Sequence, residues 1–192
     1  MGVKIHVFID ASNLWAAQKV KGYFFDYEKL KKYVKDKFKT TSVEISYYTA
    51  YPADRTREYS LEGRHRFYTF LKKGLGINVV KKKLKRIRTV TEEGETIEEK
   101  GNMDVEITID ALHNMKKYDT AILFTGDSDF LALASYLMGR GKQVYIFSTR
   151  NNVSEELRTG SNGYTDVLDI ETDIWGKEIE YRKKRLKGEI NH

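Results

Sequence analysis

The feature that most constrains this chain is an apolar run that stops at a glycine and is followed by two aspartates one residue apart. The run covers residues 121–124, the glycine is Gly126, and the carboxylates are Asp127 and Asp129. A short apolar run bounded by turn residues is typical of a buried strand, and the apolar spacing over residues 130–137 predicts a helix packed on it. We therefore expect both aspartates where a strand ends and a helix begins, the edge at which open α/β sheets bind ligands.

The same arrangement occurs at the start of the chain. Residues 3–9 predict a strand, Asp10 follows at once, and Ser12 or Asn13 is a candidate cap for the next helix. If the two strands are parallel neighbours, Asp10 meets the later pair, and three close carboxylates need a cation or shared protons at neutral pH. Oxygen ligands alone favour Mg²⁺ or Mn²⁺. Helix capping is the alternative role for each aspartate taken singly. For Asn13 two roles stay open, a helix cap or a side chain that points into the ligand cleft.

Asp104 begins a further predicted helix, whose apolar residues recur as far as Met115. A carboxylate at a helix start is common, and Asn102 is a candidate cap. Lys100, just before it, is a candidate to neutralise a phosphate or the site itself. Asp110 lies nearly two turns farther along, so we do not expect it to reach the ion that Asp104 would bind.

Strands and helices alternate along most of the chain, which predicts an α/β fold with a mainly parallel sheet and helices on both faces. The expected strands span residues 3–9, 43–51, 77–90, 119–125, 142–147 and 167–168. The expected helices begin at residues 13, 27, 55, 104, 129 and 154. A β-hairpin at about residues 78–100 is expected to project from the sheet or lie at its edge. Residues 1–170 thus form one domain in this prediction, and 171–192 form a basic C-terminal helix.

Composition excludes several classes of protein. The chain contains no cysteine, so it has no disulfide, thiolate zinc site or cysteine nucleophile. Its four histidines show no ligand spacing, and it has no P-loop, dinucleotide-binding or serine-nucleophile motif. Without an apolar run near the ~20 residues of a membrane helix, and without a signal-peptide layout, we expect a cytoplasmic protein with no membrane partner.

Basic residues gather in two stretches of a chain whose net charge is +6 and whose pI is about 9.2. Such stretches are often only solvated faces, but near a carboxylate cluster they favour binding of a phosphate backbone. Trp15, Tyr23 and Phe24 are candidates for stacking on the bases of a single strand, with core packing as the alternative. The candidate nucleic-acid contacts are Asn13, Lys81, Lys82, Lys83, Lys85, Arg86, Arg88, Lys100, Arg182, Lys183, Lys184 and Arg185.

Several short motifs together resemble the NYN family, a branch of the PIN-like nucleases that includes LabA-like proteins. The matching motifs lie at residues 8–13, 100–104, 125–130, 141–144 and 154–158. The resemblance implies a PIN-like three-layer α/β/α sandwich and metal-dependent cleavage of RNA. The acidic pattern of the family falls on Asp10, Asp104, Asp127 and Asp129, which implies that these residues bind Mg²⁺ or Mn²⁺ and are catalytic.

One position departs from the family pattern. Similar proteins tend to have an acidic residue shortly after the leucine that corresponds to Leu157, and Asn162 occupies the expected position. An amide oxygen binds metal with less charge than a carboxylate, which puts a second metal ion, and the activity, in question. The main hypothesis is a metal-dependent ribonuclease acting on single-stranded RNA, with DNA as an open alternative.

Two other functions stay open. A nucleic-acid-binding module without useful catalysis, acting with a partner, predicts salt-dependent RNA binding without cleavage. A different Mg²⁺-dependent phosphotransfer domain uses similar carboxylates. One such domain, the TOPRIM-like domain, requires a glutamate at the end of an earlier strand, and we cannot place one. A haloacid-dehalogenase-like phosphatase requires an aspartate at the position of Ser12. The hairpin and the tail are also candidates for a homodimer contact.

Overall fold

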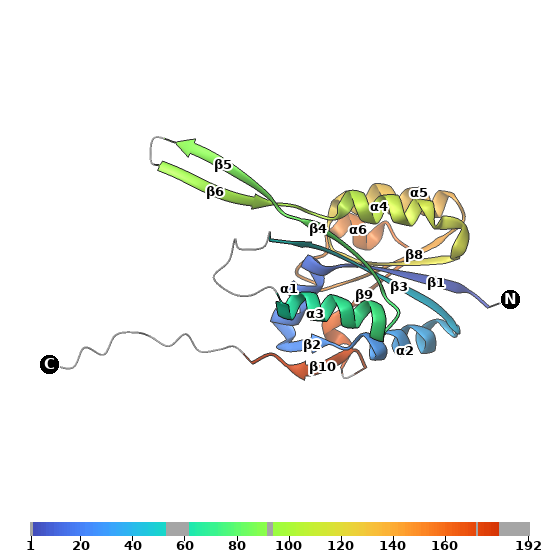
Figure 1. Cartoon of the computed structure of the whole chain (residues 1–192). Coiled ribbons are helices and arrows are strands. Elements are labelled where there is room, and N and C mark those ends of the chain that lie inside the picture. The colour runs from blue at the N-terminus through green and yellow to red at the C-terminus, as the bar shows by residue number, and fades with distance from the viewer. Residues whose placement is uncertain (1, 53–61, 92–93, 172, 181–192) are drawn as a thin grey trace.

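The centre of the molecule is a six-stranded sheet. The computed structural model describes residues 2–52, 62–91, 94–171 and 173–180. The strands are β1 (Lys4–Asp10), β3 (Ser42–Tyr51), β4 (Asn78–Lys83), β7 (Thr120–Phe124), β8 (Gln143–Ser148) and β9 (Gly163–Asp166). They stand in the order β4-β3-β1-β7-β8-β9, and every neighbouring pair is parallel (Figure 1).

The order of the strands reverses next to β1. From β1 the chain adds β3 and β4 on one side, and it then returns to add β7, β8 and β9 on the other. The boundary between β1 and β7 is therefore a topological switch point, the place where open α/β sheets bind ligands beyond the carboxyl ends of their strands. Asp10 is the last residue of β1 and Asp127 comes shortly after β7, so both lie at this boundary.

Helices cover both faces of the sheet, which confirms the expected three-layer α/β/α fold. One face carries α1 (Ala11–Lys21), α2 (Tyr27–Phe38) and α3 (Glu62–Thr69), and the other carries α4 (Asp104–His113), α5 (Leu131–Gly139) and α6 (Glu155–Thr159) (Figure 1). A π-helical turn follows at Phe70–Gly74, and 3₁₀ turns occur at Met115–Lys117, Ser128–Phe130 and Val167–Asp169. Within the described ranges, no helix has the length and apolar character needed to cross a membrane.

The alternation of side chains along β1 supplies both layers of the core. Ile5, Val7 and Ile9 lie in the apolar cluster on the side of α1 and α2, whereas Phe8 packs in the opposite cluster with Ile107 of α4. All five side chains are at most 2% exposed. Because successive residues of a strand face opposite sides, one buried strand contributes to both layers and fixes the level of its terminal Asp10.

The β-hairpin is present, but its bounds differ from those expected. Its arms are β5 (Lys85–Thr91) and β6 (Gly94–Lys100), which pair antiparallel and project away from the sheet (Figure 1). The expectation of one strand over 77–90 is wrong, because Asn78–Lys83 pairs with β3 as the edge strand of the sheet. Leu84 divides the two strands, and its N–H donates a hydrogen bond to the carbonyl oxygen of Tyr51 at 2.8 Å, where β3 ends.

The C-terminal segment also differs from the expectation. The described part of the predicted helix forms β10 (Trp175–Glu178), which pairs antiparallel with β2 (Tyr23–Phe25). Trp175 is buried, and its Nε1 donates a hydrogen bond to the carbonyl oxygen of Ile170 at 2.8 Å, so burial of this ring overrides helix propensity. The rest of the predicted basic helix, residues 181–192, lies outside the described residues.

Two smaller expectations need adjustment. The helix expected from residue 55 is described from Glu62, and residues 53–61 lie outside the described ranges. The strand expected at 167–168 is a 3₁₀ turn. The side chain of Asp166 starts this turn by accepting a hydrogen bond from the backbone N of Leu168 at 3.0 Å, after β9 has ended.

Candidate metal centre

The side chain of Asp10 closes β1 and starts α1. Its Oδ1 accepts hydrogen bonds from the backbone N of Ser12 at 2.9 Å and from the Ser12 hydroxyl at 2.8 Å. Asp10 itself therefore caps the helix, and the expectation that Ser12 or Asn13 does so is wrong. A carboxylate accepts stronger hydrogen bonds than a neutral group, and its negative charge is stabilised by the positive end of the helix dipole. These bonds fix the Asp10 carboxylate at the carboxyl edge of the sheet.

Asn13 reaches across to a neighbouring strand. Its Oδ1 accepts a hydrogen bond from the hydroxyl of Ser148, the last residue of β8, at 3.2 Å. This contact keeps the half-buried Asn13 at the same edge as Asp10. Our sequence reasoning missed Ser148. The signal that identifies it is its place as a polar residue at the end of a buried strand, the position that Asp10 has in β1.

The turn after β7 presents Asp127 and Asp129. The Oδ1 of Asp127 accepts a hydrogen bond from the backbone N of Asp129 at 3.0 Å, which caps the 3₁₀ turn Ser128–Phe130. Both carboxylates are exposed, whereas the ring of Phe130 is buried in the core. Burial of Phe130 thus holds the turn while the two carboxylates stay accessible to a ligand.

Asp104 arrives from a different element, as the first residue of α4. Asn102 donates a hydrogen bond from its Nδ2 to the Oδ2 of Asp104. The expectation that Asn102 caps the helix is wrong, because its side chain bonds this carboxylate and the helix begins without a side-chain cap. A hydrogen bond to a charged acceptor is stronger than one between neutral groups, which accounts for the preference.

These carboxylates converge on one point. Asp104, Asp127 and Asp129 each offer an oxygen, and the three oxygens lie within 4.8 Å of one another. Partial burial raises the pKa of Asp104, and the charges of Asp127, Asp10 and Asp129 raise it further. Burial likewise raises the pKa of Asp10, with a contribution from Asp127, against hydrogen bonds from Ser12 that lower it. The four aspartates predicted from the sequence therefore interact as one group.

The described residues supply few cations to the cluster. Among the residues that the structure describes, none of the four aspartates forms an ion pair. Lys82 is near enough to lower the pKa of Asp104, but its Nζ pairs with the carboxylate of Glu106 at 2.8 Å. Carboxylate oxygens are the ligands that Mg²⁺ and Mn²⁺ prefer, so the residues present fit a hard divalent cation.

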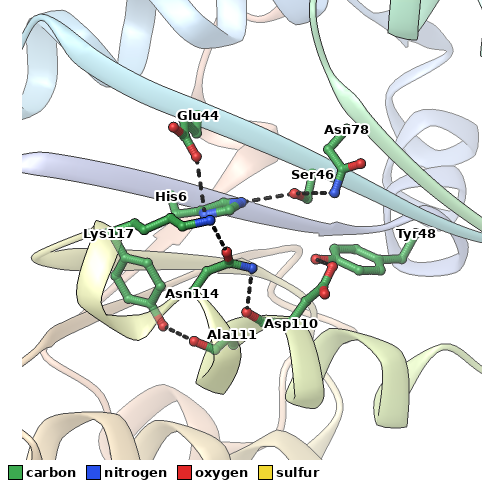
Figure 2. A network of polar contacts seen from close by, with 10 residues as sticks. His6, Glu44, Ser46, Tyr48, Asn78, Asp110, Ala111, Asn114 and Lys117 are labelled. Carbon is green, nitrogen blue, oxygen red and sulfur yellow. Dashed lines mark hydrogen bonds and ion pairs between the residues drawn. The ribbon is translucent and has the colours of Figure 1, made fainter.

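Asp110 lies outside this group of carboxylates. Its Oδ2 accepts a hydrogen bond from the hydroxyl of Tyr48 at 2.9 Å. Figure 2 shows this pair beside a polar network that joins β1 to β3 through a hydrogen bond of 2.9 Å between His6 and Ser46. Asp110 is thus a structural partner of Tyr48, and the expectation that it does not share an ion with Asp104 agrees with this arrangement.

Asn162 lies where the strands of the sheet begin, at the opposite end from the carboxylate cluster. It directly precedes β9, and its Oδ1 accepts a hydrogen bond from the backbone N of Val144, near the start of β8, at 2.7 Å. Because the strands are parallel, residues at their starts are one strand length away from residues at their ends. The expectation that Asn162 occupies a metal-ligand position is therefore wrong, and its amide says nothing against the metal site.

The first basic stretch divides between two elements. Lys81, Lys82 and Lys83 lie on β4, and Lys85, Arg86 and Arg88 lie on β5. The ammonium of Lys82 is occupied by Glu106, and the Nε of Arg86 lies 3.9 Å from a carboxylate oxygen of Glu99. The side chains of Lys83 and Lys85 are exposed. The side chain of Lys100 and the residues Arg182, Lys183, Lys184 and Arg185 lie outside the described part of the chain.

Comparison with known proteins identifies the family. A family model of the NYN domain matches residues 4–169, nearly the whole described chain. The chain belongs to the NYN domain family. NYN domains are a branch of the PIN-like nucleases, so the resemblance seen in the sequence motifs is confirmed, and the carboxylate cluster of this NYN domain is compatible with that membership.

One curated relative and one solved structure are similar to this NYN domain. The Low amplitude and bright protein LabA of Synechococcus elongatus is 28% identical over 173 residues, which cover 89% of this chain and 87% of LabA. The crystal structure of a protein of unknown function from Vibrio parahaemolyticus superimposes with a TM-score of 0.65 at 21% identity, covering 91% of this chain and 96% of that one. The structural likeness supports the α/β fold alone.

Proposed function

We propose that this NYN domain is a ribonuclease that hydrolyses phosphodiester bonds of single-stranded RNA with Mg²⁺ or Mn²⁺. The observation that carries the proposal is the convergence of Asp104, Asp127 and Asp129 within 4.8 Å, beside Asp10 at the switch point of a parallel sheet. Membership of a PIN-like nuclease family supports the same chemistry. DNA is the alternative substrate, and the assay described below compares the two.

The four aspartates would bind the ion. When bound, the ion lowers the pKa of a coordinated water and stabilises negative charge on the attacked phosphate. The protein contributes fixed positions: hydrogen bonds from Ser12 orient Asp10, and a hydrogen bond from Asn102 orients Asp104. Ligands held in this way need little reorganisation during the reaction. No protein nucleophile is needed for this chemistry.

Binding of the RNA backbone is assigned to basic residues near the cluster. Lys81 and Lys83 on the edge strand β4 and Lys85 at the start of the hairpin strand β5 are exposed. Lysine ammonium groups contact phosphates without reading the base sequence, so this contribution should weaken steeply with salt. Asn13, Lys82, Arg86, Arg88, Lys100 and the basic residues of the C-terminal tail are further candidates for the same role.

The proposal is tested by incubating end-labelled single-stranded RNA, and single-stranded DNA of the same sequence, with the protein in Mn²⁺, Mg²⁺ or EDTA. We expect cleavage of RNA that requires the metal and that falls by at least about a hundredfold in Asp10→Asn, because the variant loses a charged ligand. The matched control is Asp36→Asn, the same change at an exposed position on α2. Equal cleavage by Asp10→Asn and wild type would overturn the assignment.

A different result would support the binding module instead. In that case neither metal gives a product, while RNA binding remains and weakens with salt. Circular dichroism of each variant separates loss of a ligand from loss of the fold. The cluster would then serve to bind a cation that shapes the RNA site without cleavage.

A further inference from the structure

A cavity of about 650 Å³ opens beside the carboxylate cluster. It lies between α1, β3, α3 and the base of the hairpin, and its lining includes Asp10, Asn102 and Met103, the last of which directly precedes Asp104. Pockets of about 300–1,000 Å³ are the usual size of sites for small organic ligands. The cavity thus borders the candidate metal centre at Asp10 and is large enough for one nucleoside.

The walls of the cavity are mainly aromatic. The aromatic lining residues on this face of the sheet are Trp15, Phe24, Phe25, Tyr27, Tyr47, Phe67 and Tyr68. Tyr47 lies at the centre of this group, with its ring centroid 6.0 Å from Tyr27 and 6.0 Å from Phe67, both edge to face. Trp15 and Phe24 differ from ordinary core residues, because they remain 43% and 45% exposed. Exposed rings at a cavity mouth have free faces on which a ligand can stack.

Polar groups in the same cavity suit the edge of a base. The hydroxyl of Tyr68 lies 3.3 Å from that of Thr49. Burial raises the pKa values of Tyr27 and Tyr47 above their ordinary value, so both hydroxyls stay protonated, and they hydrogen-bond to each other. Aromatic faces combined with a few fixed donors and acceptors are what a nucleobase, with its flat ring and polar edge, requires.

Positive charge also lies at the cavity. Arg64 of α3 lines the cavity. The ammonium of Lys81 lies 5.7 Å from the ring centroid of Tyr68 and 5.9 Å from that of Tyr51. Asp10 lines the same cavity. A strand that places one base among the rings therefore has both cations and a carboxylate close to its backbone.

We propose that this cavity binds a single unpaired nucleobase of the RNA and thereby places a neighbouring phosphate at the carboxylate cluster. The proposal rests on the proposed function for the identity of the substrate as RNA. A base that is paired within a duplex must leave its stack to enter such a cavity, at a cost of a few kcal/mol. The cavity thus gives a physical reason for a preference for single strands, with Trp15 and Phe24 as stacking residues.

Binding in EDTA tests this inference without cleavage. The probes are a fluorescein-labelled short oligoadenylate and an oligomer of the same length in which every base is replaced by hydrogen, so that only the sugar-phosphate backbone remains. We expect Trp15→Ala and Phe24→Ala each to weaken binding of oligoadenylate by about tenfold, the usual scale for losing one stacking contact. Binding of the abasic oligomer should be unchanged, because the variants leave the cations in place.

Tyr136→Ala is the matched control, since Tyr136 is 45% exposed on α5 and does not line the cavity. Two outcomes overturn the inference: unchanged oligoadenylate binding in both variants, or equal weakening of both probes. Trp15 and Phe24 are partly exposed, so two independent variants guard against a failure to fold. The cleavage assay tests the proposed function separately. Base-dependent binding without any metal-dependent product would contradict the nuclease function but would still support a base-binding cavity.

Discussion

Gly126 and Asn152 lie in direct backbone contact. A Cβ atom added to Gly126 would lie 2.2 Å from the carbonyl oxygen of Asn152 and 2.8 Å from the hydroxyl of Ser148. The carbonyl oxygen of Gly126 also accepts a hydrogen bond from the backbone N of Ser154 at 2.9 Å. The turn that carries Asp127 is thus seated on the loop after β8, and only a residue without a side chain permits this close approach.

Gly126→Ala should therefore damage both stability and the metal site. The clash is with backbone and cannot be relieved by rotation of a side chain, so we expect a loss of about 1–3 kcal/mol in the free energy of unfolding. RNA cleavage should fall as Asp127 moves. Urea denaturation and the cleavage assay measure the two effects. Gly139→Ala, at a glycine with open space around it, is the control and should keep wild-type cleavage.

Asp104→Asn should stabilise the metal-free protein at neutral pH. The folded-state pKa of Asp104 is raised above 3.8 by partial burial and three neighbouring carboxylates, so the folded state binds this proton more tightly than the unfolded state. Stability in EDTA should accordingly fall as the pH rises from 3.8 through the raised pKa. Asp104→Asn should lose less stability than wild type over this pH range. Thermal melts of both proteins across acidic to neutral pH would contradict the idea if Asp104→Asn and wild type showed the same dependence of stability on pH.

Divalent metal should stabilise the wild-type protein through the same group of residues. A ligand present at a hundred times its dissociation constant stabilises the folded state by about 2.7 kcal/mol. Mn²⁺ should therefore raise the melting temperature of wild type and of Asp36→Asn, but not that of Asp127→Asn, which loses a carboxylate of the cluster. A full Mn²⁺ shift in Asp127→Asn would place the ion elsewhere.

His6 should make stability depend on pH at mildly acidic values. Burial lowers its pKa below 6.5, although Glu44 and Asp110 act to raise it and Lys117 acts to lower it (Figure 2). The unfolded state then binds the proton first, so the free energy of unfolding should decline as the pH falls from about 6.5 through the lowered pKa.

His6→Gln tests this interpretation. The variant should lose some stability at neutral pH, because the His6 ring stacks on Phe8 with centroids 4.1 Å apart, but the decline below about pH 6.5 should become shallower. His113→Gln, at an exposed histidine on α4, is the control and should retain the wild-type pH profile. An identical profile in His6→Gln and wild type would assign the decline to other groups.

Much of the sheet and of the candidate site was predictable because the relevant signals are local. The apolar stretches that became β1 and β7 end next to their aspartates, and their burial follows from composition alone. Because the carboxyl ends of parallel strands lie at one edge of a sheet, the sequence already predicts that Asp10 and Asp127 lie close together. Errors arose where a contact distant in the sequence overrode a local pattern, as when Leu84 divides an apparently continuous strand by bonding Tyr51.

The amino-acid sequence by itself determined the fold class, the family and the four candidate ligands, since strand and helix periods and short motifs are properties of neighbouring residues. Tertiary structure alone decided that Asp104 meets Asp127 and Asp129, and that Asn162 lies at the far edge. It also decided that the rings around Tyr47 enclose a cavity beside Asp10. These relations depend on how helices pack on the sheet. Packing brings together side chains that are far apart in the sequence, so no local sequence pattern predicts their contact.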